Sequence, residues 1–184
     1  MPRQQPSLAS YSDVMRVCQA VFQKKHKDYG TAWRILRLPA ITDQIMIKAQ
    51  RIRSISDKGQ QRIVDSLQTE LIGIINYGII ALIQIRLSAH EPLQVPEEDL
   101  QKHYDNVVAE TMQLLESKNH DYGEAWRAMR CSSIIDIILM KLLRIKRIED
   151  NANQTCVSEG VASNYQDIIN YAVFASLKQA APCP

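Results

Sequence analysis

The sequence has few residues that interrupt helices. Only 6 glycines and 7 prolines occur among its 184 residues. Ile, Leu, Ala, Gln, Lys and Arg dominate the middle of each half, and most of these residue types favour helices. No run alternates with the period of two that a half-buried strand requires. We therefore predict an all-α fold.

Features of secreted and membrane proteins are also missing. The four cysteines form no C-x-x-C pair, and the polar segment MPRQQPSLASYSD has no apolar stretch like that of a signal peptide. The apolar run at residues 71–85 contains Asn76 and Gln84 and is shorter than the roughly 20 residues that span a membrane. We expect a cytoplasmic protein with reduced thiols and no membrane partner, in which this run forms a buried helix.

No long stretch carries charge of one sign. The formal net charge is +2, and basic residues are mixed with acidic ones. Proteins that grip duplex nucleic acid through its phosphates present a basic patch or stripe. The charge pattern therefore argues against a duplex nucleic acid as partner.

What the sequence does contain is a long internal repeat. The phrase KHKDYGTAWR at residues 25–34 returns as KNHDYGEAWR at residues 118–127, an offset of 93. After one inserted residue, IINY at residues 74–77 falls on IINY at residues 168–171. A period this long indicates duplication of a whole packing unit rather than a short solenoid repeat.

The duplication predicts the domain organisation. Residues 1–90 form the first helical-bundle repeat and residues 97–184 the second, while Pro92 and Pro96 prevent a continuous helix through the connector at residues 91–96. A chain of this length buries one sizeable core, so we expect one compact internal pseudo-dimer. The predicted helices cover residues 12–27, 40–57 and 61–88 in the first repeat and 97–118, 133–150 and 157–179 in the second, with Ser12 as the first N-cap.

Cationic side chains interrupt the apolar face of the second predicted helix in each repeat. At 100° per residue, Lys141 lies within a stripe of isoleucines and Arg144 lies at its edge. Lys48 and Arg51 take the same positions in the first repeat. Two interpretations stay open, because buried charges need partners. The side chains reach solvent or the protein's own acids, or they form a clamp for the phosphates of a ligand.

The D-Y-G turn has a conformational role. Gly30 and Gly123 suit the left-handed residue that ends a helix. We expect the tyrosines that precede them, Tyr29 and Tyr122, to pack back on the core.

Several aspartates need a partner. Asp28 and Asp121 face the negative end of a helix dipole, and the inward lysine or arginine of the second helix is the expected partner. Asp136 fits a capping box with Ser133. Asp43, at the equivalent position in the first repeat, has no such explanation.

Two tryptophans and two asparagines have more than one interpretation. Trp33 and Trp126 belong to the core or stack on the base of a nucleotide. Asn76 and Asn170 lie among apolar residues and must be hydrogen-bonded if buried, either to another helix or to a ligand. All four are candidate ligand contacts.

The third predicted helix divides an acidic motif between the repeats. The first repeat has Glu70 and Gly73, whereas the second has Asn164 and Asp167. Each repeat therefore keeps one acid of an E-x-x-D pattern. If that pattern held a metal ion, a shared site would draw on Glu70 and Asp167 together.

The run K-x-x-DYG-x-AWR, followed by D-x-x-x-x-K-x-x-R and D-I-I-N-Y-A, resembles the nucleotide modification associated domain family over most of both halves. That family is similar in outline to the all-α nucleoside triphosphate pyrophosphatases of the MazG and dimeric dUTPase group. In those enzymes E-x-x-E and E-x-x-D on successive helices bind Mg²⁺, and the α–β phosphate bond is split. The resemblance implies Mg²⁺ as cofactor and matches Glu70 and Asp167 to the E-x-x-D acids. The chain departs from the pattern where lysine and arginine replace E-x-x-E.

These observations lead to one hypothesis and two alternatives. We predict a protein that binds a nucleotide or a related phosphorylated small molecule and, if it is an enzyme, acts as a nucleoside triphosphate pyrophosphatase. The first alternative is a non-catalytic nucleotide-binding module accessory to base modification, and the second is a structural or interaction domain. A homodimer is left open. The predicted ligand contacts are Lys48, Arg51, Lys141, Arg144, Asp28, Asp121, Tyr29, Tyr122, Trp33, Trp126, Asn76 and Asn170.

Overall fold

The computed structural model describes residues 6–58, 66–87, 92–155 and 159–180, without the side chains of residues 6–10, 121, 122 and 180. Within these ranges the chain forms α-helices and short 3-10 helices and no strand, which confirms the all-α prediction. The order of elements is the same in the two repeats. The first contains α1 (Pro6–Tyr29), η1 (Ala32–Ile35), α2 (Leu38–Lys58) and α3 (Leu67–Arg86), and the second contains α4 (Glu97–Tyr122), η2 (Ala125–Ala128), α5 (Cys131–Asp150) and α6 (Val161–Ala180).

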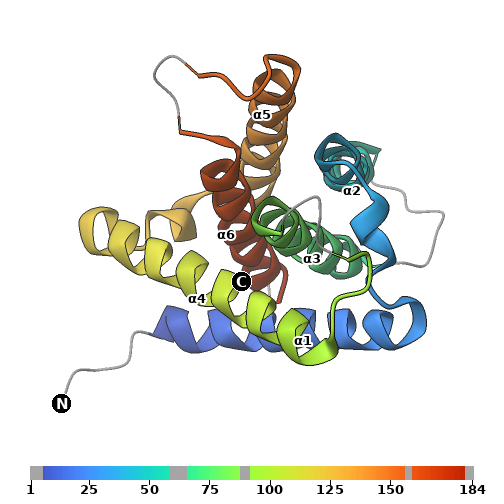
Figure 1. The fold of residues 1–184 in the computed structure, drawn as a ribbon. Helices are drawn as coiled ribbons and strands as arrows, with labels where there is room; N and C mark the ends of the chain where they lie inside the picture. The colour runs from blue at the N-terminus through green and yellow to red at the C-terminus, as the bar shows by residue number, and fades with distance from the viewer. Residues whose placement is uncertain (1–5, 59–65, 88–91, 156–158, 181–184) are drawn as a thin grey trace.

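Four helices form a shared core. Helices α3 and α6 pack on each other at its centre, α2 packs on α3, α5 packs on α6, and α2 meets α5. Helices α1 and α4 run along one side of this core, and each contacts both α3 and α6 (Figure 1). The apolar run of the sequence lies in α3, whose length and composition would suffice to span a membrane. Its most apolar window is 61% buried inside the molecule, which fits the predicted core helix.

Some predicted helix starts are wrong. Helix α1 already begins at Pro6, so Ser12 is not its N-cap. Helix α5 begins at Cys131 with Arg130 at the N-cap position, so Ser133 and Asp136 lie inside the helix and form no capping box. A polar residue marks a helix start weakly when the residues before it are equally compatible with a helix. The predicted helical residues 61–65, 88 and 157–158 lie outside the described ranges.

Matched hydrogen bonds join the repeats through two asparagines. The Tyr11 hydroxyl in α1 donates to Asn170 Oδ1 in α6 at 2.8 Å, and the Tyr104 hydroxyl in α4 donates to Asn76 Oδ1 in α3 at 3.1 Å. Each asparagine also donates through Nδ2 to a backbone carbonyl of the first helix in its own repeat. Tyr11 and Tyr104 are 93 residues apart, so the two sets are copies of one arrangement. Each set satisfies a buried amide with helices from both repeats.

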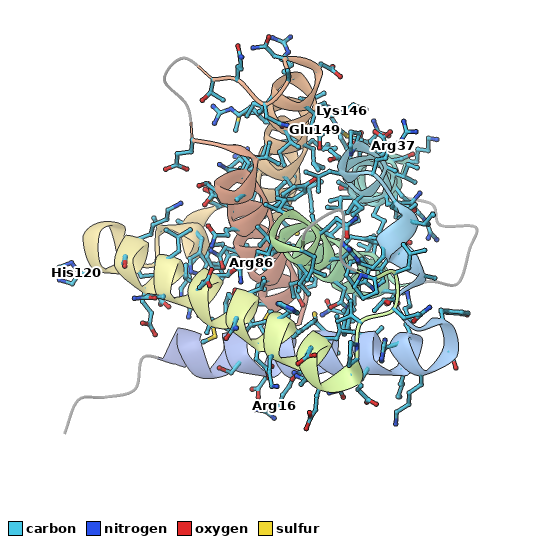
Figure 2. The ribbon with its side chains drawn as sticks, in the orientation of Figure 1. Arg16, Arg37, Arg86, His120, Lys146 and Glu149 are labelled. Carbon is cyan, nitrogen blue, oxygen red and sulfur yellow. The ribbon has the colours of Figure 1, made fainter. Side chains whose placement is uncertain are left out.

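Matched ion pairs join α2 to α5. Lys146 Nζ lies 2.6 Å from Asp43 Oδ1, and Arg53 Nη1 lies 3.6 Å from Asp136 Oδ1. These pairs are also related by the 93-residue offset. Figure 2 shows Lys146 on α5, from which it reaches Asp43 of α2. Asp43, which had no partner in the sequence pattern, therefore binds a lysine of the other repeat.

Candidate functional site

A cavity of about 510 Å³ lies in the first repeat, between the end of α1, η1 and the neighbouring surfaces of α2 and α3. Aromatic and aliphatic side chains form most of its wall, and three basic side chains reach it. Among the described residues that line it, none is Asp or Glu. Its aromatic residues are Phe22, Tyr29, Trp33 and Tyr77, and its basic residues are Lys25, His26 and Lys48.

The D-Y-G turn shapes one wall of the cavity. Gly30 has φ +59° and Gly123 has φ +62°, so the predicted positive φ is confirmed at both, while ψ of −159° places Gly123 outside the left-handed helical region. The buried Thr31 hydroxyl donates to the Leu93 carbonyl at 2.5 Å and accepts from the Val95 amide at 3.1 Å. The connector between the repeats therefore holds the turn that leads into η1, and η1 places Trp33 against the cavity.

The cations of α2 share one acid. Lys48 Nζ lies 3.2 Å from Glu70 Oε2, and Arg51 pairs with Glu70 Oε1. The Glu70 side chain is 6% exposed, while those of Lys48 and Arg51 are 26% and 27% exposed. Lys48 lies over Gly73, where an added Cβ would be 2.8 Å from Lys48 Cε. The missing side chain at residue 73 gives Lys48 its path between Glu70 and the cavity.

Different side chains occupy the equivalent region of the second repeat. Asp167 replaces Gly73 and accepts hydrogen bonds from Lys118 at 2.5 Å and from Lys141 at 2.6 Å. Phe174 replaces Ile80 and stacks on Trp126, with ring centroids 4.5 Å apart and planes 3° apart. In the first repeat, Gly73 and Ile80 line the cavity. At the equivalent positions of the second repeat, Asp167 forms an ion-pair cluster with two lysines and Phe174 forms a ring stack with Trp126.

The two repeats match the same protein-family model. The family model described as nucleotide modification associated domain 1 matches residues 25–85 and again residues 118–178. The chain belongs to this family. It contains two tandem copies of the nucleotide modification associated domain. The matches begin at Lys25 and Lys118, each three residues before the aspartate of the D-Y-G turn. No curated protein and no solved structure matches the chain.

The two domain copies place their predicted contacts differently. In the first copy, Trp33, Tyr29, Lys48 and Asn76 all line the cavity. The expectation that Tyr29 packs on the core is wrong, because this side chain is 68% exposed. Asn76 Nδ2 donates to the Cys18 carbonyl, and Asn76 Oδ1 accepts from the Tyr104 hydroxyl. Both polar atoms of this amide therefore already have partners within the protein.

In the second domain copy, Trp126 and Asn170 belong to the buried core. Arg144 is exposed, so its predicted inward orientation is wrong. The side chains of Asp121 and Tyr122 lie outside the described part of the chain. Their first-copy counterpart Asp28 is exposed and makes no hydrogen bond or ion pair with any residue that the structure describes.

Glu70 and Asp167 do not fit a magnesium site. Each carboxylate already binds two cationic side chains. Within the described ranges, no group of three or more His, Cys, Asp or Glu residues is arranged to hold a metal ion. Mg²⁺ prefers carboxylate oxygens and water, and here it would have to approach beside ammonium and guanidinium groups.

The sequence pattern missed two basic residues of the cavity. Lys25 has a counterpart in Lys118, but His26 faces Asn119 at the repeat offset and gave no repeat signal. His26 Nδ1 is buried without a hydrogen-bond partner in the described structure, which costs about 1–3 kcal/mol. The difference in size between Ile80 and Phe174 was the available sign that the copies enclose different spaces.

Proposed function

We propose that the first domain copy binds a nucleotide, or a closely related phosphorylated small molecule, as a non-catalytic module accessory to base modification. One observation carries this proposal: the cavity combines aromatic walls with three basic side chains and no acid among its described lining residues. Stacking of a base on an aromatic ring contributes about 1–3 kcal/mol, and lysine ammonium groups bind phosphate. The family's description, which links the domain to nucleotide modification, agrees with a ligand of this class.

The proposal favours binding over hydrolysis because the acids that hydrolysis would use are engaged elsewhere. Glu70 holds Lys48 and Arg51, and Asp167 holds Lys118 and Lys141. Mg²⁺-dependent pyrophosphohydrolysis stays the competing prediction. An assay of pyrophosphate release from each nucleoside triphosphate, with and without Mg²⁺, separates the two. Binding without turnover supports the module, and turnover that requires Mg²⁺ overturns it.

The binding test uses the pseudo-symmetry of the chain as its control. We expect Lys48→Met to weaken nucleotide binding by about tenfold or more, because this ammonium reaches the cavity. Lys141→Met removes the equivalent lysine of the second copy, which binds Asp167, and should leave the affinity within about twofold. Circular dichroism would establish that both variants remain folded.

Tryptophan fluorescence provides the readout. Trp33 lines the cavity, whereas Trp126 is buried in the ring stack. Titration with nucleotides should therefore change the emission of Trp126→Phe, which retains Trp33, and not that of Trp33→Phe. A wild-type protein whose emission and calorimetric titration respond to no nucleotide would rule out the proposed function.

A further inference from the structure

We infer that the cavity selects a nucleoside monophosphate over the corresponding di- and triphosphates, and that Glu70 sets this selectivity. The inference rests on the proposed function and narrows its ligand to one class. Two observations support the inference. The first is the balance of charge around the cavity. The second is the position of Glu70, which within the described structure is the only acid that contacts a basic residue of the cavity.

The summed charge of the lysines that line the cavity and of the ion pairs that Lys48 joins matches one phosphate group. Lys48 and Arg51 contribute two positive charges and Glu70 one negative charge, which leaves +1. Lys25 raises the sum to +2, with His26 counted as neutral. A phosphate monoester carries about −1.5 to −2 at pH 7. A single phosphate would therefore neutralise the site, and each further phosphate would add charge that the site does not balance.

A triphosphate would also find no carboxylate for its metal ion among the described lining residues, which offer only hydroxyl groups such as that of Thr69. Proteins bind triphosphates with Mg²⁺ that bridges phosphate oxygens and is held by acidic or hydroxyl side chains. The described lining residues include no Asp or Glu, and both Glu70 oxygens point to cations of α2. Lysine and imidazole groups can bind a phosphate directly, without a metal ion.

Glu70 is the residue placed to limit the ligand charge. Its side chain is 6% exposed, so its charge is poorly screened by solvent, and it lies against the lysine that reaches the cavity. The second copy has Asn164 at this position, with Nδ2 donating to the Gly160 carbonyl at 3.0 Å. The acid at this helix position therefore occurs in the first copy, where its partner Lys48 lines the cavity.

The test measures affinity for a nucleoside and its mono-, di- and triphosphates, for each of the five common bases, with and without Mg²⁺. In the wild-type protein we expect the monophosphate to bind about tenfold more tightly than the triphosphate. Glu70→Gln should improve triphosphate binding and reduce this preference by at least about threefold. Asp167→Asn makes the same change of charge in the second copy and should preserve the wild-type preference.

The possible results separate this inference from the proposed function. A wild-type protein that binds the triphosphate as tightly as the monophosphate, in either Mg²⁺ condition, overturns the selectivity and leaves nucleotide binding intact. An unchanged preference in folded Glu70→Gln overturns the role of Glu70. The wild-type comparison requires no variant, so it decides the selectivity even if Glu70→Gln fails to fold. Absence of binding by every nucleotide overturns the proposed function itself.

Discussion

Glu149 illustrates how a single residue at the contact between the repeats acquires unusual acid–base behaviour. The Thr42 hydroxyl of α2 donates to Glu149 Oε1 at 2.8 Å, and the Tyr165 hydroxyl lies 2.6 Å from Thr42 Oγ1. Figure 2 shows Glu149 on α5 next to Lys146. Burial raises the pKa of Glu149 above its ordinary value, and the hydrogen bond from Thr42 opposes this rise. The folded state therefore holds the proton of Glu149 more tightly than the unfolded state does.

This raised pKa predicts how stability changes with pH. As pH rises from below the ordinary glutamate pKa of about 4.3 through the raised folded value, the unfolded state ionises first, so the contribution of Glu149 to stability falls. Glu149→Gln keeps an acceptor for Thr42 and removes the titration. Urea denaturation at several pH values gives the free energy of unfolding of each protein. The wild-type value minus the Glu149→Gln value should decrease as pH rises across this range. Identical pH profiles would contradict the prediction.

At the scale of elements, α1 and α4 are held to the core by bonds that cross between the repeats. Each asparagine accepts from a tyrosine of the opposite repeat, so α1 is tied to α6 and α4 is tied to α3. These hydroxyls are buried, and burial raises the pKa of both Tyr11 and Tyr104. The tyrosines therefore remain neutral donors throughout the ordinary pH range.

Removal of either hydroxyl should therefore destabilise the fold by a similar amount. We expect Tyr11→Phe and Tyr104→Phe each to cost about 1–3 kcal/mol, because a buried asparagine oxygen loses its donor. Tyr171→Phe is the matched control, since its hydroxyl has no hydrogen-bond partner within the described ranges, and it should change stability by less than about 0.5 kcal/mol. Urea denaturation measures all three. Equal effects of the three substitutions would refute this account of α1 and α4.

At the scale of the whole molecule, the repeats are two halves of one core. Helices α3 and α6 approach closely at Gly78, where an added Cβ would lie 2.8 Å from Ile169 Cγ1. The ion pairs between α2 and α5 and the tyrosine–asparagine bonds also cross between repeats. A repeat by itself would expose the apolar face that its partner covers.

This shared core predicts how the chain behaves when it is divided. Fragments 1–90 and 91–184, produced separately, should lack cooperative thermal unfolding, because each loses the apolar contacts that α3 makes with α6 and α2 makes with α5. Produced together, they should purify as a 1:1 complex whose mass by light scattering equals that of the intact chain. Two independently folded monomeric fragments would contradict the prediction and would indicate separate domains.

The sequence by itself determined the duplication, the all-α class and the two glycines with positive φ. These features depend on local periodicity and on the conformations open to a single residue, which neighbours along the chain decide. It also marked Lys48, Arg51 and Lys141 as cations on an apolar face. The predicted helix start at Ser12 was wrong, because the residues before it are also compatible with a helix.

Only the tertiary structure decided which partners those cations meet and which side chains lie beside Lys48 and Lys141. Both copies have the same lysine, turn and tryptophan, so the pattern alone treats them as equal. The outcome depends on side-chain volume and charge brought together from separate helices: Phe174 stacks on Trp126 and Asp167 binds two lysines in one copy, whereas Gly73 and Ile80 border open space in the other. Such contacts join residues that are distant in the chain, so the local periodicity of the sequence does not predict them.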